Sequence, residues 1–174
     1  MPLLELLLDF GAAIEGRGSK DWERPLFTAL AFGMSGAAKA LAKRGARIDL
    51  PAAAGLGLVD DTVHLLPSAS SEARHRALSL AAQHGHAEVV RMLLNSGEDP
   101  NRYNLAGNHA HSTPLHQAVL GGYEAVIRVL IEYGARVDIR DTIWEGTPLG
   151  WALHGGGKAQ AQMAECLRSL GAVD

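Results

Sequence analysis

Apolar residues and glycines recur along the chain in one fixed register. Residues 85–97 (GHAEVVRMLLNSG) and 122–134 (GYEAVIRVLIEYG) each run from a glycine, through apolar residues at helical spacing, to a second glycine twelve positions later. Residues 33–45 form a third copy, and a shorter apolar segment precedes each first glycine. Apolar residues at this spacing predict pairs of short amphipathic helices.

An alanine lies four positions before each of the glycines that open these segments. The alanines are Ala29, Ala53, Ala81, Ala118 and Ala152, and the glycines are Gly33, Gly57, Gly85, Gly122 and Gly156. A small residue lets the neighbouring helix approach closely, and glycine supplies the positive φ of a tight turn. Since no single helix pair can bury its own apolar face, we expect the pairs to stack on one another.

Residues 112–138 resemble an ankyrin repeat over its full length. They read Ser-Thr-Pro-Leu-His-Gln-Ala, then Gly122, then an apolar helix to Gly134, then Ala-Arg-Val-Asp. Residues 81–101 match nearly as well, and several copies in one register make the motif specific. The resemblance implies an all-α ankyrin-repeat solenoid of stacked helix-turn-helix units with short hairpin-like tips, about five repeats plus an N-terminal half repeat.

The resemblance extends over one domain, residues 1–174. We expect the units 1–15 (the half repeat), 16–48, 49–70, 71–104, 105–138 and 139–174. Several of them depart from the family pattern. The unit around Gly57 is short, the segment 67–76 is an addition that lengthens the next first helix with Ser71 near its N-cap, and 101–112 form a long tip.

The half repeat leaves an open question about the N-terminal edge. Leu3, Leu4, Leu6, Leu7 and Leu8 align with the apolar stripe of the second helix at 89–94, but a first helix is missing before them. We therefore expect exposed leucines there. Three explanations stay open: the chain is a fragment, its start is misplaced, or it self-associates through this edge.

Composition excludes several other classes of protein. The net charge is -3 and no long run of Lys or Arg occurs, so binding to nucleic acid or to an anionic membrane has no electrostatic support. No uncharged apolar run approaches the roughly 20 residues that span a bilayer. The single cysteine rules out an internal disulfide and fits a reducing compartment, so we expect a soluble cytoplasmic protein.

Histidines offer the best candidate for chemistry. His109, His111 and His116 would supply imidazole ligands for zinc or copper, and a metal-binding or hydrolytic protein using this tip is one alternative. Ser112, His116 and Asp138 can be written as a triad, but no strained elbow or oxyanion hole accompanies them. In the ankyrin resemblance His116 is the structural histidine of its repeat. We therefore expect no catalysis, no metal and no cofactor.

The resemblance places recognition of a partner on the concave side, formed by first helices and tips. In this register the predicted partner-binding residues are Phe32, Leu56, Gln83, His84, Tyr103, His109, Leu120, Arg140, Trp144 and His154. Trp144 allows two interpretations: it packs over Trp151, or it is an exposed anchor. The sequence thus predicts a protein–protein interaction scaffold with an unidentified protein or peptide partner; a regulatory module of an associated enzyme is a further alternative.

Overall fold

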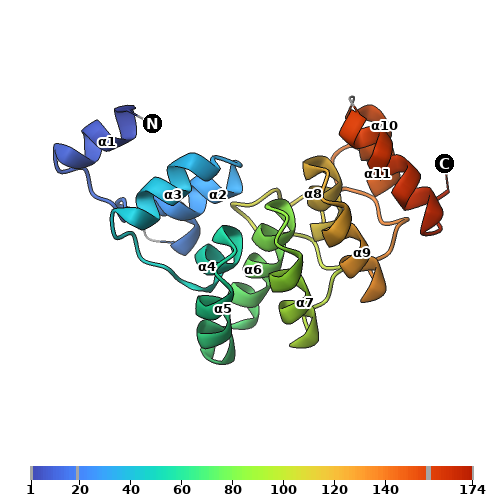
Figure 1. The fold of residues 1–174 in the computed structure, drawn as a ribbon, viewed down its shortest axis with the longest axis horizontal. Coiled ribbons are helices and arrows are strands. Elements are labelled where there is room, and N and C mark those ends of the chain that lie inside the picture. The colour runs from blue at the N-terminus through green and yellow to red at the C-terminus, as the bar shows by residue number, and fades with distance from the viewer. Residues whose placement is uncertain (1, 19, 156–157, 174) are drawn as a thin grey trace.

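The chain folds as a curved row of helix pairs. A computed structural model describes residues 2–18, 20–155 and 158–173, and within these ranges it contains eleven α-helices and no strand. Figure 1 shows the pairs following one another from the N-terminal to the C-terminal end, with the two termini at opposite ends of a bend. The prediction of an all-helical stack of helix-turn-helix units is confirmed.

Each pair consists of an inner helix followed by an outer helix. The inner helices are α2 (Pro25–Ala31), α4 (Leu50–Leu56), α6 (Ser71–Gln83), α8 (Pro114–Gly121) and α10 (Pro148–His154). The outer helices are α3 (Ser35–Lys43), α5 (Val59–Leu65), α7 (Ala87–Asn95), α9 (Glu124–Glu132) and α11 (Lys158–Ser169). A single helix, α1 (Pro2–Asp9), precedes them, and two 3-10 turns, η1 (Asp21–Glu23) and η2 (Leu66–Ser68), lie in the connections.

Local chemistry fixes where the inner helices begin. Four of them carry a proline in the first turn, where its fixed φ suits the helix and its missing N–H costs nothing. The fifth, α6, starts from Ser70, whose hydroxyl accepts the backbone N–H of Ala73 at 3.2 Å. As expected, α6 is lengthened, to 13 residues.

The predicted glycine turns have the expected backbone conformation. Gly33, Gly57, Gly85 and Gly122 all have φ between 69° and 82°, and Gly156 lies outside the described residues. At Gly85 a second constraint applies, because a Cβ would lie 2.6 Å from the Tyr123 ring. The alanines four positions upstream are all buried, which confirms that the inner helices approach one another closely there.

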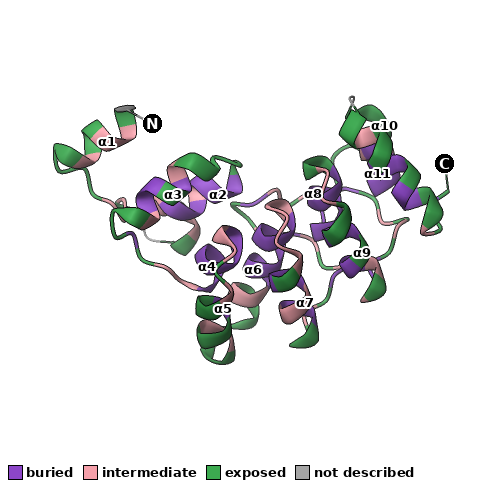
Figure 2. Ribbon diagram, in the orientation of Figure 1, coloured by how far each residue is buried: buried purple, intermediate pink, exposed green. Residues whose placement is uncertain are grey.

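The apolar core divides into two clusters. The larger runs from α4 to the C-terminal unit through side chains such as Leu93, Leu115 and Ile127, and the smaller joins α2, α3 and part of α4. Figure 2 shows buried residues concentrated where neighbouring pairs meet and exposed residues on the outer surface. The inner helices between the clusters pack tightly, since a Cβ at Gly55 would lie 3.0 Å from Leu30 and 3.2 Å from Leu80.

The N-terminal helix has the environment expected of half a repeat. Arg44, at the end of α3, donates to Glu5 at 2.8 Å and to Asp9 at 2.7 Å, which holds α1 beside the next unit. Leu4 and Leu8 are half-buried against the smaller cluster. The opposite face of the helix is exposed, at Leu3, Leu6 and Leu7 and at the following Phe10.

Candidate binding surface

The long connection between α7 and α8 folds back across the stack to the first complete unit. Within it, the carbonyl of Ala106 accepts a hydrogen bond from Arg76 at 2.7 Å, and the Arg76 guanidinium lies 4.4 Å from the centre of the Trp22 ring. Gly107 also lies against Trp22, where a Cβ would approach within 2.7 Å. The predicted long tip is therefore not a free projection but a strap that contacts the start of the chain's first complete unit (Figure 1).

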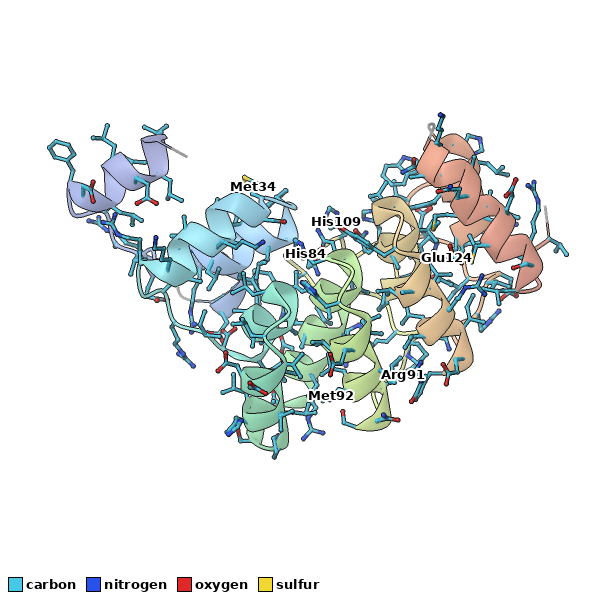
Figure 3. The ribbon with its side chains drawn as sticks, in the orientation of Figure 1. Met34, His84, Arg91, Met92, His109 and Glu124 are labelled. Atoms are coloured by element: carbon cyan, nitrogen blue, oxygen red, sulfur yellow. The ribbon has the colours of Figure 1, made fainter. Side chains whose placement is uncertain are left out.

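The last carbonyls of α2 receive side chains from distant parts of the sequence. Leu30 O accepts Nε2–H of His84 at 2.9 Å, and Ala31 O accepts Gln83 at 2.8 Å and Nε2–H of His109 at 2.9 Å. Carbonyls at a helix C-terminus have no partner within the helix, so these donors complete the cap. Figure 3 shows His84 and His109 together at the inside of the bend.

These contacts also set the charge of His84. Burial lowers its pKa, and the hydrogen bond to Leu30 only partly offsets this effect. The ring is therefore neutral at physiological pH and donates through Nε2. Gln83, His84 and His109, three residues of the predicted binding set, thus use ring or amide donors to hold the stack together.

Five rings form a continuous row along the inner side, which we call the aromatic row. It consists of Phe32, His109, His111, Trp144 and Trp151. Successive ring centroids are 6.4 Å apart from Phe32 to His109, 6.1 Å to His111 and 5.1 Å to Trp144, and the two tryptophans are 6.2 Å apart. These separations are typical of edge-to-face aromatic packing.

Asp141 fixes the turn that presents Trp144. Its carboxylate, only 2% exposed, accepts backbone N–H groups of Ile143, Trp144 and Gly146 at 2.7–2.9 Å and the indole N–H of Trp151 at 2.9 Å. Burial raises the pKa of Asp141, but these four donors outweigh it and lower the pKa to about 2. A charged, fully hydrogen-bonded carboxylate therefore holds the backbone of Trp144 and the indole of Trp151 in place.

Trp144 combines the two arrangements considered from sequence. Its ring packs edge-on against Trp151, yet 68% of the residue is exposed. Its ring contacts with His111 and Trp151 restrict an indole that still faces solvent, which reduces the conformational entropy lost on binding a ligand.

Two apolar grooves border the aromatic row. The Trp groove has a volume of about 670 Å³, and the smaller Phe groove about 330 Å³. The Trp groove is lined by His109, His111, Gln117, Leu120, Trp144, Gly146, Gly150, Trp151, His154 and Gly155. The Phe groove is lined by Trp22, Thr28, Ala31, Phe32, Gly107, Asn108, His109 and His111. His109 and His111 belong to both linings and separate the two grooves as a shared wall.

Within the described part of the chain, His111 in the shared wall and Asn108 in the Phe groove both have polar side-chain atoms without a hydrogen-bonding partner. Among the described residues the His111 ring has aromatic contacts but no hydrogen bond, and burial lowers its pKa, so it lines the grooves as a neutral imidazole. Asn108 is 1% exposed, and neither atom of its side-chain amide has a hydrogen-bonding partner. Buried polar groups are normally paired, so an unpaired amide beside a groove is a notable exception.

The structure divides the predicted binding residues into two groups. Phe32, His109, Leu120, Trp144 and His154 line the grooves. The other predicted residues lie outside the grooves. Leu56 is half-buried against the smaller core cluster, and Gln83 and His84 cap α2. The Tyr103 hydroxyl donates to Arg140 O, and the Arg140 side chain donates to Glu145 O at 2.6 Å.

Three of the ring-bearing groove residues are missing from the binding set predicted from sequence. The sequence pattern indicates only packing for Trp151 and a metal-ligand candidate for His111, and it indicates no role for Trp22. Aromatic residues form only 5% of the chain, and all three tryptophans line the grooves. Scarcity of tryptophan was the available signal, but it does not tell which of them come together.

A third hollow of about 530 Å³ lies near η1 and α6 and has a different character. Charged groups of both signs line it, and several pair with one another or with a neighbour: Arg76 with Glu72 at 2.9 Å, and Asp49 with Arg24 at 3.2 Å. A set of charges that already neutralise each other offers less to a ligand than the two uncharged grooves.

Two of the three histidines considered for metal binding, His109 and His116, form hydrogen bonds with the backbone through their rings. His116 is buried, its Nδ1 accepts from Thr113 and its Nε2–H donates to Gly146 O at 3.1 Å. His109 donates to Ala31 O. Over residues 2–18, 20–155 and 158–173, no group of three His, Cys, Asp or Glu side chains is arranged to hold a metal ion.

The residues written as a triad do not act together either. Ser112 donates to His109 O and accepts from Gln117, and Asp138 pairs with Arg136 on the surface. His116 is hydrogen-bonded to Thr113 instead of Ser112.

Comparison with known proteins agrees with the geometry. The family described as "Ankyrin repeats (3 copies)" matches residues 50–141, more than half of the chain. The serine/threonine-protein kinase VIK of Arabidopsis thaliana is 38% identical over 105 residues, which cover 59% of this chain and 22% of the kinase. A putative ankyrin repeat protein of Rickettsia bellii is 34% identical over 97 residues, covering 53% of this chain and 38% of that protein.

A third relative matches a shorter part of the chain. The ankyrin repeat-containing protein P1E11.10 of Schizosaccharomyces pombe is 39% identical over 70 residues, which cover 40% of this chain and 31% of that protein. The chain thus spans less than two fifths of the length of each of these three relatives. Among the described helices, none has the length and apolar character required to cross a membrane.

Proposed function

The chain belongs to the ankyrin-repeat family, and from this premise we propose that it is a non-catalytic scaffold whose two inner grooves bind a segment of a partner protein. Ankyrin repeats are in general protein–protein interaction modules. The observation that carries the finer proposal is the pair of uncharged grooves along the aromatic row. Concave, mostly apolar surfaces with a few fixed polar groups are the usual form of a binding site.

Trp144 is the expected anchor of the interface. Exposed tryptophans in well-packed surroundings carry a large share of binding energy, and Asp141 fixes the backbone of this one before any partner arrives. Leu120 and His154 extend the same groove from the inner helices α8 and α10.

A selection from a displayed library of random 12-residue peptides tests this proposal. The selected peptides are synthesised with a fluorescent label, and their Kd is measured by anisotropy. Trp144→Ala should weaken binding at least about 30-fold, since loss of a central aromatic anchor typically costs at least about 2 kcal/mol. Ile143→Ala is the matched control, because Ile143 is also exposed on the same turn but lines neither groove.

Equal Kd values for wild type and Trp144→Ala would overturn the placement of the site. Failure of the library to yield any binder would count against peptide binding by this face. Both readouts use the whole chain and do not depend on knowing the natural partner.

Other observations support the compartment, the class of partner and self-association. Cys166 is a buried free thiol, which supports a reducing compartment, and we place the protein in the cytoplasm. We propose no nucleic-acid partner, since the groove linings contain no Lys or Arg. The exposed leucine face of α1 supports self-association through the N-terminal edge.

The match to a segment of a kinase supports a second candidate, a regulatory module for an associated enzyme. In that case the groove partner would be the enzyme itself. Co-purification of a kinase activity with the wild-type chain, lost in Trp144→Ala, would favour this candidate over a free-standing scaffold.

A further inference from the structure

Two apolar grooves that share two lining residues can be filled by a single ligand. The Phe groove and the Trp groove share His109 and His111, and the aromatic row passes through both without interruption. We propose that the two grooves form one bipartite site for an extended, uncharged peptide segment that places one apolar side chain in each groove and crosses the histidine wall between them. This inference rests on the proposed function and specifies its ligand.

The absence of charged side chains from both linings favours an uncharged peptide. No Asp, Glu, Lys or Arg belongs to either lining. The outer helices contrast with this, since Arg91 pairs with Glu132 at 2.8 Å and Arg128 with Glu124 at 2.7 Å. A charged side chain entering a groove would lose hydration without finding a counter-charge, so both anchors and the residues between them are uncharged.

The geometry of the row limits the spacing of the anchors. Successive centroid steps of 6.4, 6.1 and 5.1 Å place the Phe32 and Trp144 rings at most about 18 Å apart. An extended chain advances about 3.3 Å per residue. The two anchors are therefore separated by no more than about five positions in the sequence of the ligand.

The unpaired amide of Asn108 favours an extended ligand over a helical one. Asn108 lines the Phe groove, but its amide donor and acceptor have no partner and almost no solvent access, so a ligand reaches them only when the side chain turns toward the groove. A peptide group offers a matching acceptor and donor only where it is free of internal hydrogen bonds, as in an extended segment. An unmade hydrogen bond of a buried group is costly, so a ligand that satisfies Asn108 gains affinity beyond apolar burial.

The peptide selection described above also tests this inference when the anchors are varied. We expect enriched sequences to carry two large apolar residues no more than five positions apart, with no charge between them. Replacing either anchor by alanine should weaken binding at least about tenfold. In the Phe32→Ala protein, replacing the peptide anchor that occupies the Phe groove should weaken binding no further. In the Trp144→Ala protein, the same should hold for the anchor that occupies the Trp groove.

Matched controls guard against indirect effects. Met34→Ala and Ile143→Ala remove exposed apolar side chains beside the grooves that line neither of them, and both should leave the Kd unchanged. Phe32 and Trp144 are each 68% exposed, so their replacement is compatible with an intact fold, which circular dichroism verifies.

The outcomes separate the two claims. Enriched peptides with a single anchor, sensitive to Trp144→Ala but not to Phe32→Ala, would overturn the bipartite site and leave the proposed function standing. Peptides insensitive to both variants would overturn the two together. Enrichment of peptides whose anchors lie about seven or more positions apart, as on two turns of a helix, would overturn the extended ligand.

Discussion

Replacing Asp141 by asparagine removes a charge without changing the shape of the side chain. The carboxylate accepts four hydrogen bonds, three from the backbone of its own turn and one from the Trp151 indole. An asparagine keeps one oxygen but turns an NH₂ group toward donors that need acceptors. The variant therefore loses charge-assisted bonds and gains a donor–donor conflict in a buried place.

The magnitude follows from the pKa of Asp141. Burial raises this pKa, but the four donors lower it to about 2, nearly two units below the ordinary value of 3.8. At about 1.4 kcal/mol per unit, the folded protein favours the charged form by about 2.5 kcal/mol. We expect Asp141→Asn to lower the free energy of unfolding by about 2–3 kcal/mol and Tm by roughly 5–10 °C.

Urea unfolding followed by circular dichroism and by tryptophan fluorescence measures this loss. Asp138→Asn is the matched control, because Asp138 makes an exposed ion pair with Arg136 and should change stability by less than about 1 kcal/mol. The C-terminal unit of a repeat stack can unfold separately, so the fluorescence of Trp144 and Trp151 should report the loss earlier than circular dichroism does. Equal stability of the two variants would refute the role assigned to Asp141.

Three further predictions concern stability and assembly. Burial lowers the pKa of His75 to about 4, so between about pH 6.5 and 4 the unfolded chain binds a proton that the folded chain excludes. Acidification through this window should lower the free energy of unfolding, measured by urea titration, by up to about 3 kcal/mol. His75→Gln should reduce this pH dependence. Gly85→Ala should lower the free energy of unfolding clearly more than Gly97→Ala does. Both glycines have positive φ, but only at Gly85 would the added Cβ lie 2.6 Å from an aromatic ring. Gly97→Ala should cost about 1 kcal/mol of stability, and equal melting temperatures of the two variants would contradict this prediction. Sedimentation velocity should show concentration-dependent association of the wild type that Leu3→Glu with Leu7→Glu abolishes, and a monomer at every concentration would remove the N-terminal interface.

The repeating architecture could be predicted because its causes are local. A turn that requires positive φ selects glycine, and a close helix crossing selects alanine, whatever the rest of the chain does. The register of Gly85 and Gly122 and the burial of Ala81 and Ala118 follow from these rules. Proline at the start of four inner helices is another local signal.

The grooves could not be predicted in the same way, because long-range contacts form them. His109 caps a carbonyl 78 positions away in the sequence, and no local pattern indicates that partner. For the same reason Gln83 and His84, which sequence alone assigned to a binding face, lie where their donors complete α2. The side-chain atoms of Asn108 lack hydrogen-bonding partners because of where the strap lies in the fold, and the sequence does not indicate that position.

The central claim is that the uncharged inner grooves bind the partner. The indole N–H resonances of Trp22, Trp144 and Trp151 in a ¹⁵N–¹H correlation spectrum test it directly, since the chain has only these three tryptophans and all of them line the grooves. On titration with a selected peptide, the three indole signals should shift together, while backbone signals of the outer helices α5, α7 and α9 stay in place. Shifts confined to those outer helices, with the three indoles unmoved, would contradict the account.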